Sequence, residues 1–151
     1  MRISNIRYQN IIGKVTLYAT SELGFKNLTK LSSSSYLKNN VTDVPSCDLN
    51  NLISHNKDLI LLTGNYYNFF GKLFYANKIK DFEKIIKSLR DHFNDRLYFE
   101  IQRHGENQEK NFENYLLNTS NKLGIPLIAT QEVFYLYEEM NEAHDALTCI
   151  G

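Results

Sequence analysis

The chain has 151 residues, of which 42% are hydrophobic and 13% aromatic, enough for one domain of ordinary size with a buried core. Seventeen basic residues balance seventeen acidic ones, so the sequence lacks the basic excess with which duplex-DNA binders neutralise phosphates, and we predict no direct contact with DNA. Two cysteines, Cys47 and Cys149, are too few for a disulfide framework and indicate reduced thiols in a cytoplasmic protein. Neither a signal peptide nor an apolar run of membrane-spanning length is visible, so no membrane partner is predicted.

The first half of the chain alternates between strand and helix signals. The alternation of apolar and polar residues over Lys14–Ala19 predicts a strand, and Thr20 or Ser21 is placed to cap the helix that follows. Pro45-Ser46 is expected to open a short helix. The nearly continuous apolar run Asp58–Thr63 then predicts a strand that is covered on both faces.

The second half repeats this order with stronger periodicity. Apolar residues at helical spacing predict a helix over Lys78–Phe93, followed by a strand at Leu97–Ile101. A second helix is expected to end before Gly124, and Pro126–Thr130 reads as a third buried strand. A last helix is predicted from about Glu138 toward Cys149. Strands separated by helices favour parallel pairing, so the predicted class is α/β.

Parallel strands of an α/β fold gather functional residues at their C-terminal ends. This rule indicates three places: after Thr63, at Gln102–Gly105 and at Gln131–Phe134. His104 and Glu132 follow two of the predicted strands and together could share a metal ion. The alternative is that both are polar loop residues that cap the next helices.

Other motifs carry less chemistry. The segment Gly64–Gly71 reads as an aromatic loop that either stacks a base or, in the favoured interpretation, contacts a neighbouring domain or helix. His55 and His92 lie near predicted helix C-termini, where a partly charged imidazole suits the helix dipole, and His144 is expected to pair locally. The sequence has no dinucleotide fingerprint, Walker loop, nucleophile elbow or HExxH motif.

Four segments, in this order, resemble the PHP domain (polymerase and histidinol phosphatase type) of the bacterial DNA polymerase III alpha subunit. Gly24–Leu31 is similar to its G-x-x-N-L helix, and Leu59–Gly64 to its L-[ST]-G strand. Phe93–Gly105 resembles its F-x-D-R-F-Y-x-E-[IL]-x-R-x-G strand and loop. The longest match, Leu123–Leu147, resembles its G-[IL]-P-[LV]-V-A-T…A-H-D-x-L stretch.

The resemblance implies a partial distorted (β/α) barrel with parallel strands, and a single, N-terminally incomplete domain over residues 1–151. Active members hold two or three metals at the strand ends. His104 matches one of their His ligands, Glu132 stands where they have Asp, and Phe134 stands where they have a second His. The family's early ligands have no counterpart here. We therefore expect no cofactor, with a divalent metal such as Zn, Mn or Mg bound only if another chain completes the site.

The resemblance also implies a place in DNA replication. The family's activity is that of a DNA-directed DNA polymerase, a nucleotidyltransferase, but its active site lies outside this segment, so the chain alone is expected to be inactive. The expected role is a structural or interaction fragment that braces the rest of the alpha subunit and, in some lineages, docks the proofreading exonuclease subunit. Two alternatives stay open: a residual metal-dependent phosphoesterase, or a decayed gene fragment. Open sheet edges predict marginal stability or self-association.

Overall fold

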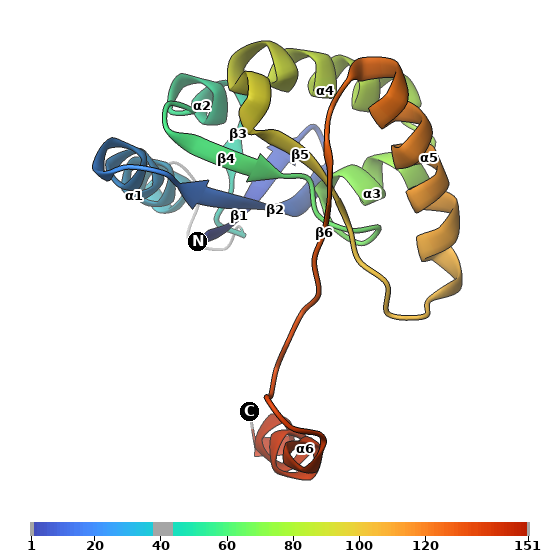
Figure 1. Ribbon diagram of the computed structural model, residues 1–151. Helices are drawn as coiled ribbons and strands as arrows, with labels where there is room; N and C mark the ends of the chain where they lie inside the picture. The colour runs from blue at the N-terminus through green and yellow to red at the C-terminus, as the bar shows by residue number, and fades with distance from the viewer. Residues whose placement is uncertain (1, 38–43, 151) are drawn as a thin grey trace.

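A computed structural model describes residues 2–37 and 44–150 of the chain. Its centre is an open sheet in which the strands follow the order β3-β1-β2-β4-β5-β6, with β3 and β6 at the two edges (Figure 1). The six strands found in the described residues are β1 (Arg2–Tyr8), β2 (Ile11–Ala19), β3 (Cys47–Asp48), β4 (Leu59–Leu62), β5 (Leu97–Ile101) and β6 (Leu127–Ala129). This mixed α/β sheet is compatible with a partial, distorted barrel.

Most of the strand pairs are parallel, as predicted. β4 pairs with β5, β5 with β6, and β1 with β3 in parallel, whereas β2 runs antiparallel to both β1 and β4. The antiparallel pairing of β2 with β4 departs from the prediction that strands separated by helices pair in parallel. The antiparallel pairing of β1 with β2 arises because β1, which was not predicted from the sequence, forms a hairpin with β2. Only Gln9 and Asn10 separate the two strands, and Gln9 has a positive φ of 54°. Such a short connection permits only antiparallel pairing.

Helices cover the sheet and follow the predicted order closely. They are α1 (Glu22–Leu37), α2 (Leu49–Ser54), α3 (Phe69–Tyr75), α4 (Ile79–Phe93), α5 (Asn107–Leu123) and α6 (Asn141–Ile150), with short 3-10 turns η1 (Asn94–Arg96) and η2 (Glu138–Met140). The Ser21 hydroxyl caps α1 by accepting the Gly24 N–H at 3.1 Å. Gly124 ends α5 in the left-handed region, at a φ of 66°, as its position predicted.

Two expectations for short segments were wrong. α2 begins at Leu49 and is capped by the Asp48 carboxylate, so the helix does not open at Pro45-Ser46. The aromatic segment Gly64–Gly71 is a loop only as far as Asn68, after which α3 begins. Phe69 and Phe70 of this helix are fully buried, because the apolar face of α3 packs into the core while Lys72 on its other face stays exposed.

The core is one continuous cluster of side chains from the sheet and from α1 to α5. α4 contributes most to it, with one face at helical spacing buried and the opposite face polar. Its buried residues are Phe82, Ile85, Ile86, Leu89 and Phe93. Across the described part of the chain, no helix has the length and apolar character needed to cross a membrane.

The end of the chain departs from the rest of the molecule. β6 was predicted to be buried, but it lies at the sheet edge, and Leu127 and Ile128 are each 37% exposed. After β6 the backbone extends away from the sheet and carries α6 at its far end (Figure 1). We call residues 131–150 the C-terminal arm, and the preceding described residues the body.

Candidate functional site

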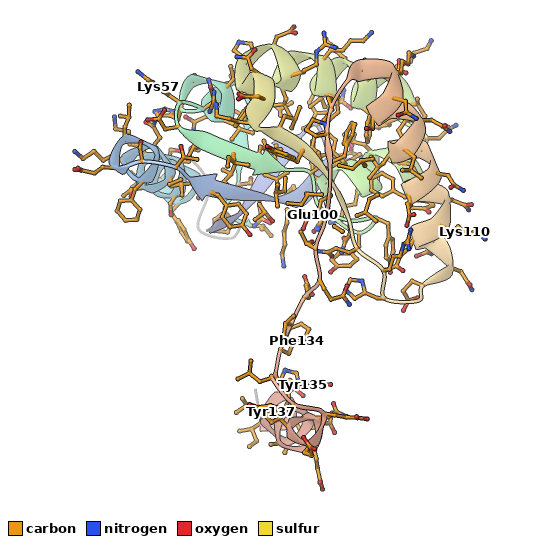
Figure 2. All side chains as sticks on the ribbon, viewed as in Figure 1. Lys57, Glu100, Lys110, Phe134, Tyr135 and Tyr137 are labelled. Atoms are coloured by element: carbon orange, nitrogen blue, oxygen red, sulfur yellow. The ribbon has the colours of Figure 1, made fainter. Side chains whose placement is uncertain are left out.

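A buried carboxylate lies where β4, β5 and β6 end. Glu100 of β5 is only 5% exposed, and Figure 2 shows it near the end of this strand. One carboxylate oxygen accepts the Gly64 N–H at 3.0 Å, and the other accepts the amide of Gln102 at 3.1 Å and the hydroxyl of Thr130. Within the described residues, three donors thus satisfy the hydrogen-bonding capacity of this carboxylate, as burial of such a group requires.

Further hydrogen bonds extend this network across the three strand ends. The Gln102 side chain accepts the Asn65 amide and donates to the Thr130 hydroxyl at 2.9 Å. The Thr63 hydroxyl accepts the Glu100 N–H at 3.1 Å. Because these groups come from the loop after β4, from β5 and from the end of β6, the Glu100 network fixes three connections at the edge where α/β folds place their sites.

The pocket beside Glu100 is too small for a substrate. Glu109 and Phe112 of α5 line it together with Tyr66 of the loop after β4, and its volume is about 10 Å³. That volume corresponds to about one water molecule. The Glu100 network therefore holds the strand ends in place, and this one pocket has no room for a sugar or a nucleotide.

His104 forms a compact unit with Glu109 of α5. Its ring Nδ1 lies 3.0 Å from the Glu109 carboxylate, which also accepts the backbone N–H groups of His104, Gly105 and Glu106. Burial raises the pKa of Glu109, but the hydrogen bonds from the His104 backbone and ring, Glu106 and Gly105 outweigh this effect, so its pKa is lowered overall. Glu106 and Glu109 also complete a capping box at the start of α5.

The contact with Glu109 determines which ring nitrogen of His104 is available to a ligand. With Nδ1 held by the carboxylate, Nε2 is the ring nitrogen left to bind a metal or a substrate. Metal-binding histidines are commonly oriented by a carboxylate in this way. Beside the pair, Arg103 and Glu113 form a two-point ion pair with contacts of 3.0 and 2.6 Å. The Arg103 hydrogen bond holds the pKa of Glu113 below its usual range.

Glu132 is placed in a different environment. It lies in the exposed C-terminal arm and accepts a hydrogen bond from the Tyr67 hydroxyl at 3.2 Å. Burial, together with the negative charge of Glu132, raises the pKa of Tyr67. No hydrogen bond joins Glu132 to His104 in the described residues. The two predicted ligands thus have different partners, Glu109 for His104 and Tyr67 for Glu132, and the structure does not bring them together.

The donor set does not fit a metal ion on its own. Among the residues that the structure describes, no group of three or more His, Cys, Asp and Glu side chains is arranged to hold one. Phe134, which the resemblance aligns with a His ligand, is an exposed side chain whose ring centroid lies 5.3 Å from that of His144. Because an open catalytic zinc site uses three protein ligands, we derive no chemical step through a metal here.

The other three histidines have local partners, and His55 and His92 lie at the C-terminal ends of α2 and α4, where they were predicted. The ring nitrogens of His55 and His92 lie 3.0 and 2.7 Å from the backbone carbonyls of Asn51 and Ser88, one turn earlier in their helices. His144 contacts the aromatic rings at the start of the arm. The sequence analysis missed Glu100 because a single Glu in a strand reads as an exposed residue. The only available signal was its place between apolar neighbours.

The open, mostly parallel sheet and its polar strand ends define an α/β domain related to (β/α) barrels. Residues 5–104 match the PHP domain, and the chain belongs to that family. It is 36% identical over 150 residues to the DNA polymerase III subunit alpha of Rickettsia bellii, covering 99% of this chain and 13% of the relative. The same subunit of Vibrio cholerae is 33% identical over 137 residues, and that of Caulobacter vibrioides 34% over 135. The chain spans about 12–13% of the length of these relatives, and the resemblance seen in the sequence is confirmed.

Proposed function

We propose that this chain is a structural segment of a replicative DNA polymerase alpha subunit and contributes no polymerase active site. Its relatives are DNA polymerase III alpha subunits, of which it corresponds to about one eighth. The partner is the rest of the alpha subunit, and docking of the proofreading exonuclease subunit stays an expectation of the resemblance. We further propose that the chain acts in the cytoplasm. It does so without direct contact to DNA, since its net charge is zero.

One observation carries this proposal. The strand ends at which an enzyme of this architecture would bind substrate are occupied by the Glu100 network, and the adjoining pocket has room for about one water. The side chains there hold the loops after β4, β5 and β6 to one another. A segment whose polar residues fix its own loops suits a bracing role better than a catalytic one.

A chimeric polymerase tests the proposal. The aligned segment of the Rickettsia bellii alpha subunit is replaced by this chain, and primer extension is compared with that of the parent subunit and of the chain alone. We expect the chimera to extend primers and the chain alone to extend none. A chimera that folds but has lost extension would contradict a bracing role. As a control, the same replacement with Glu100→Gln is expected to lower the thermal stability of the chimera.

The second candidate function is metal-dependent phosphoester hydrolysis, and the orientation of His104 by Glu109 is the observation in its favour. We propose that the chain alone lacks this activity, because His104 and Glu132 supply two ligands of the three that an open site uses. The measurement is hydrolysis of p-nitrophenyl phosphate with added Mn²⁺ or Zn²⁺. Metal-stimulated turnover that disappears in His104→Ala would establish the phosphoesterase and refute our proposal.

A further inference from the structure

The C-terminal arm exposes a concentration of apolar side chains. Leu136 and Ile150 are 82% and 84% exposed, and Val133, Tyr137 and Leu147 are also largely in contact with solvent. The one hydrogen bond from the arm to the body found in the described residues joins Glu132 to Tyr67. An apolar surface of this kind indicates an interaction site.

The charge of the arm indicates what it binds. The arm contains no Lys or Arg and five acidic residues. All seventeen basic residues and the other twelve acidic ones therefore lie in the rest of the chain, so the arm carries −5 and the rest +5. An acidic, apolar arm excludes nucleic acid as its partner and favours an apolar surface with a basic rim. Its acidic residues are Glu132, Glu138, Glu139, Glu142 and Asp145.

The body offers such a surface. A groove of about 340 Å³ lies between the β1–β2 hairpin, α2 and α4, and its partly exposed apolar lining includes Tyr8, Leu49 and Ile53. Arg7 and Lys84 also line it, together with the single acidic residue Asp48. Two more lysines extend this basic rim along α4: Lys80 and Lys87 are both exposed and lie four and three residues from Lys84, on the same side of the helix.

The arm and the groove of one molecule do not meet. In Figure 1, α6 lies beyond one end of the sheet, while α4 and α2 lie on the opposite side of the body. The two surfaces complement each other in polarity and charge but are separated within a single copy. Contact between them therefore requires a second copy of the chain.

We propose that the C-terminal arm docks into the groove between β1, α2 and α4 of a second copy, and that two chains exchange arms as a symmetric dimer. Each copy then gives one arm and receives one, so the contact closes on itself and no further copy is added. Apolar side chains such as Leu136 lose water in the groove, and Glu138 and Glu139 approach the lysines of α4. This inference goes beyond the bracing role, since it concerns the chain by itself.

Sedimentation equilibrium on the full chain tests the proposal. We expect a mass of twice 17.6 kDa at high protein concentration, with a dissociation constant that rises with added salt. Either charge reversal, Lys84→Glu in the groove or Glu138→Lys with Glu139→Lys in the arm, is expected to weaken the dimer by about tenfold. Combining the two reversals places opposite charges together again and is expected to recover most of the affinity.

Lys110→Glu is the matched control, because it makes the same charge change on α5, away from α4 and the arm (Figure 2). We expect it to leave the dimer unchanged, and circular dichroism confirms that each variant is folded. A chain that stays monomeric at all concentrations overturns the proposal without affecting the bracing role. A dimer that weakens equally in Lys84→Glu and Lys110→Glu, or that is not recovered by the combined reversals, also overturns it.

Discussion

The body and the C-terminal arm use similar apolar residues with opposite results. In the body, Phe, Leu and Ile side chains from the sheet and from α1 to α5 form one buried cluster. In the arm, Leu136 and Ile150 are more than four-fifths exposed. The difference lies in what surrounds each segment: the body has several elements that cover one another, whereas α6 packs against the short turn η2. Apolar side chains are buried only where another helix or strand covers them.

Truncation of one large side chain in each region gives the strongest test of this comparison. Phe82 packs against the rings of Phe70, Phe99 and Tyr115. Phe82→Ala is expected to lower the free energy of unfolding by about 3–5 kcal/mol. Leu136→Ala is expected to change it by less than about 0.5 kcal/mol. Urea unfolding, at a protein concentration low enough for the monomer, measures both, and equal losses would show that the arm is part of the core.

The reactivity of the two cysteine thiols also compares the body with the arm, and it requires no substitution in the core. Cys47 is buried in β3, and burial, followed by the nearby charge of Asp48, raises its pKa to about 11. Cys149 is exposed in the arm. At pH 8 we expect a thiol reagent to modify Cys149 at least about a hundredfold faster than Cys47. Cys149→Ser should leave only the slow reaction, and a fast reaction in that variant would mean that β3 opens readily.

Replacing a carboxylate with an amide tests whether a buried glutamate, Glu100, stabilises the fold more than an exposed one, Glu132. Glu100→Gln keeps the shape of the side chain but turns an NH₂ group toward groups that all donate hydrogen bonds. We expect it to destabilise the fold by about 1–3 kcal/mol. Glu132→Gln, in the arm, is expected to cost less than about 0.5 kcal/mol. The midpoints of urea unfolding distinguish them, and a neutral Glu100→Gln would show that the strand ends do not depend on this carboxylate.

The smallest expected effect is a pH dependence of the free energy of unfolding in the acidic range. The pKa of Glu109 in the folded chain lies below its ordinary value. The ionised carboxylate therefore adds its full share to the free energy of unfolding at pH values above the unfolded pKa of about 4.3. The contribution is lost as the pH falls from there through the lowered folded pKa. We expect the unfolding free energy of Glu109→Gln to fall less between pH 5 and pH 3 than that of the parent chain. The parallel change Glu142→Gln, in α6 of the arm, is the control for the loss of one carboxylate, and equal slopes for Glu109→Gln and the parent chain would contradict the prediction.

Local signals predicted the elements in which sequence and environment agree. The periodicity of α4, the extent of β5 and the Gly124 end of α5 depend on neighbours within a few residues. β1 and α3 were missed because their character depends on distant partners. β1 is defined by pairing with β2 and β3, and α3 by burial of Phe69 and Phe70 in the core.

The site was harder to predict for the same reason. Gly64 and Thr130, which hold Glu100, lie 36 and 30 residues away in the sequence. Only the fold brings them together. His104 was identified from its place after a strand, but its partner Glu109 was not. Glu109 reads as an ordinary residue in the first turn of a helix, and its contact depends on the turn at Gly105, whose φ is 89°.

The strand order has a consequence for how the chain is made. The β1–β2 hairpin needs only its own residues, and β3 then pairs with β1, β4 with β2, β5 with β4, and β6 with β5. Each strand is added to an edge of the sheet that already exists, and none of these six has to be inserted between two others. Translation therefore presents each of β2 to β6 after the strand with which it pairs. The sheet of these six strands can grow in the order of translation, and the arm follows them.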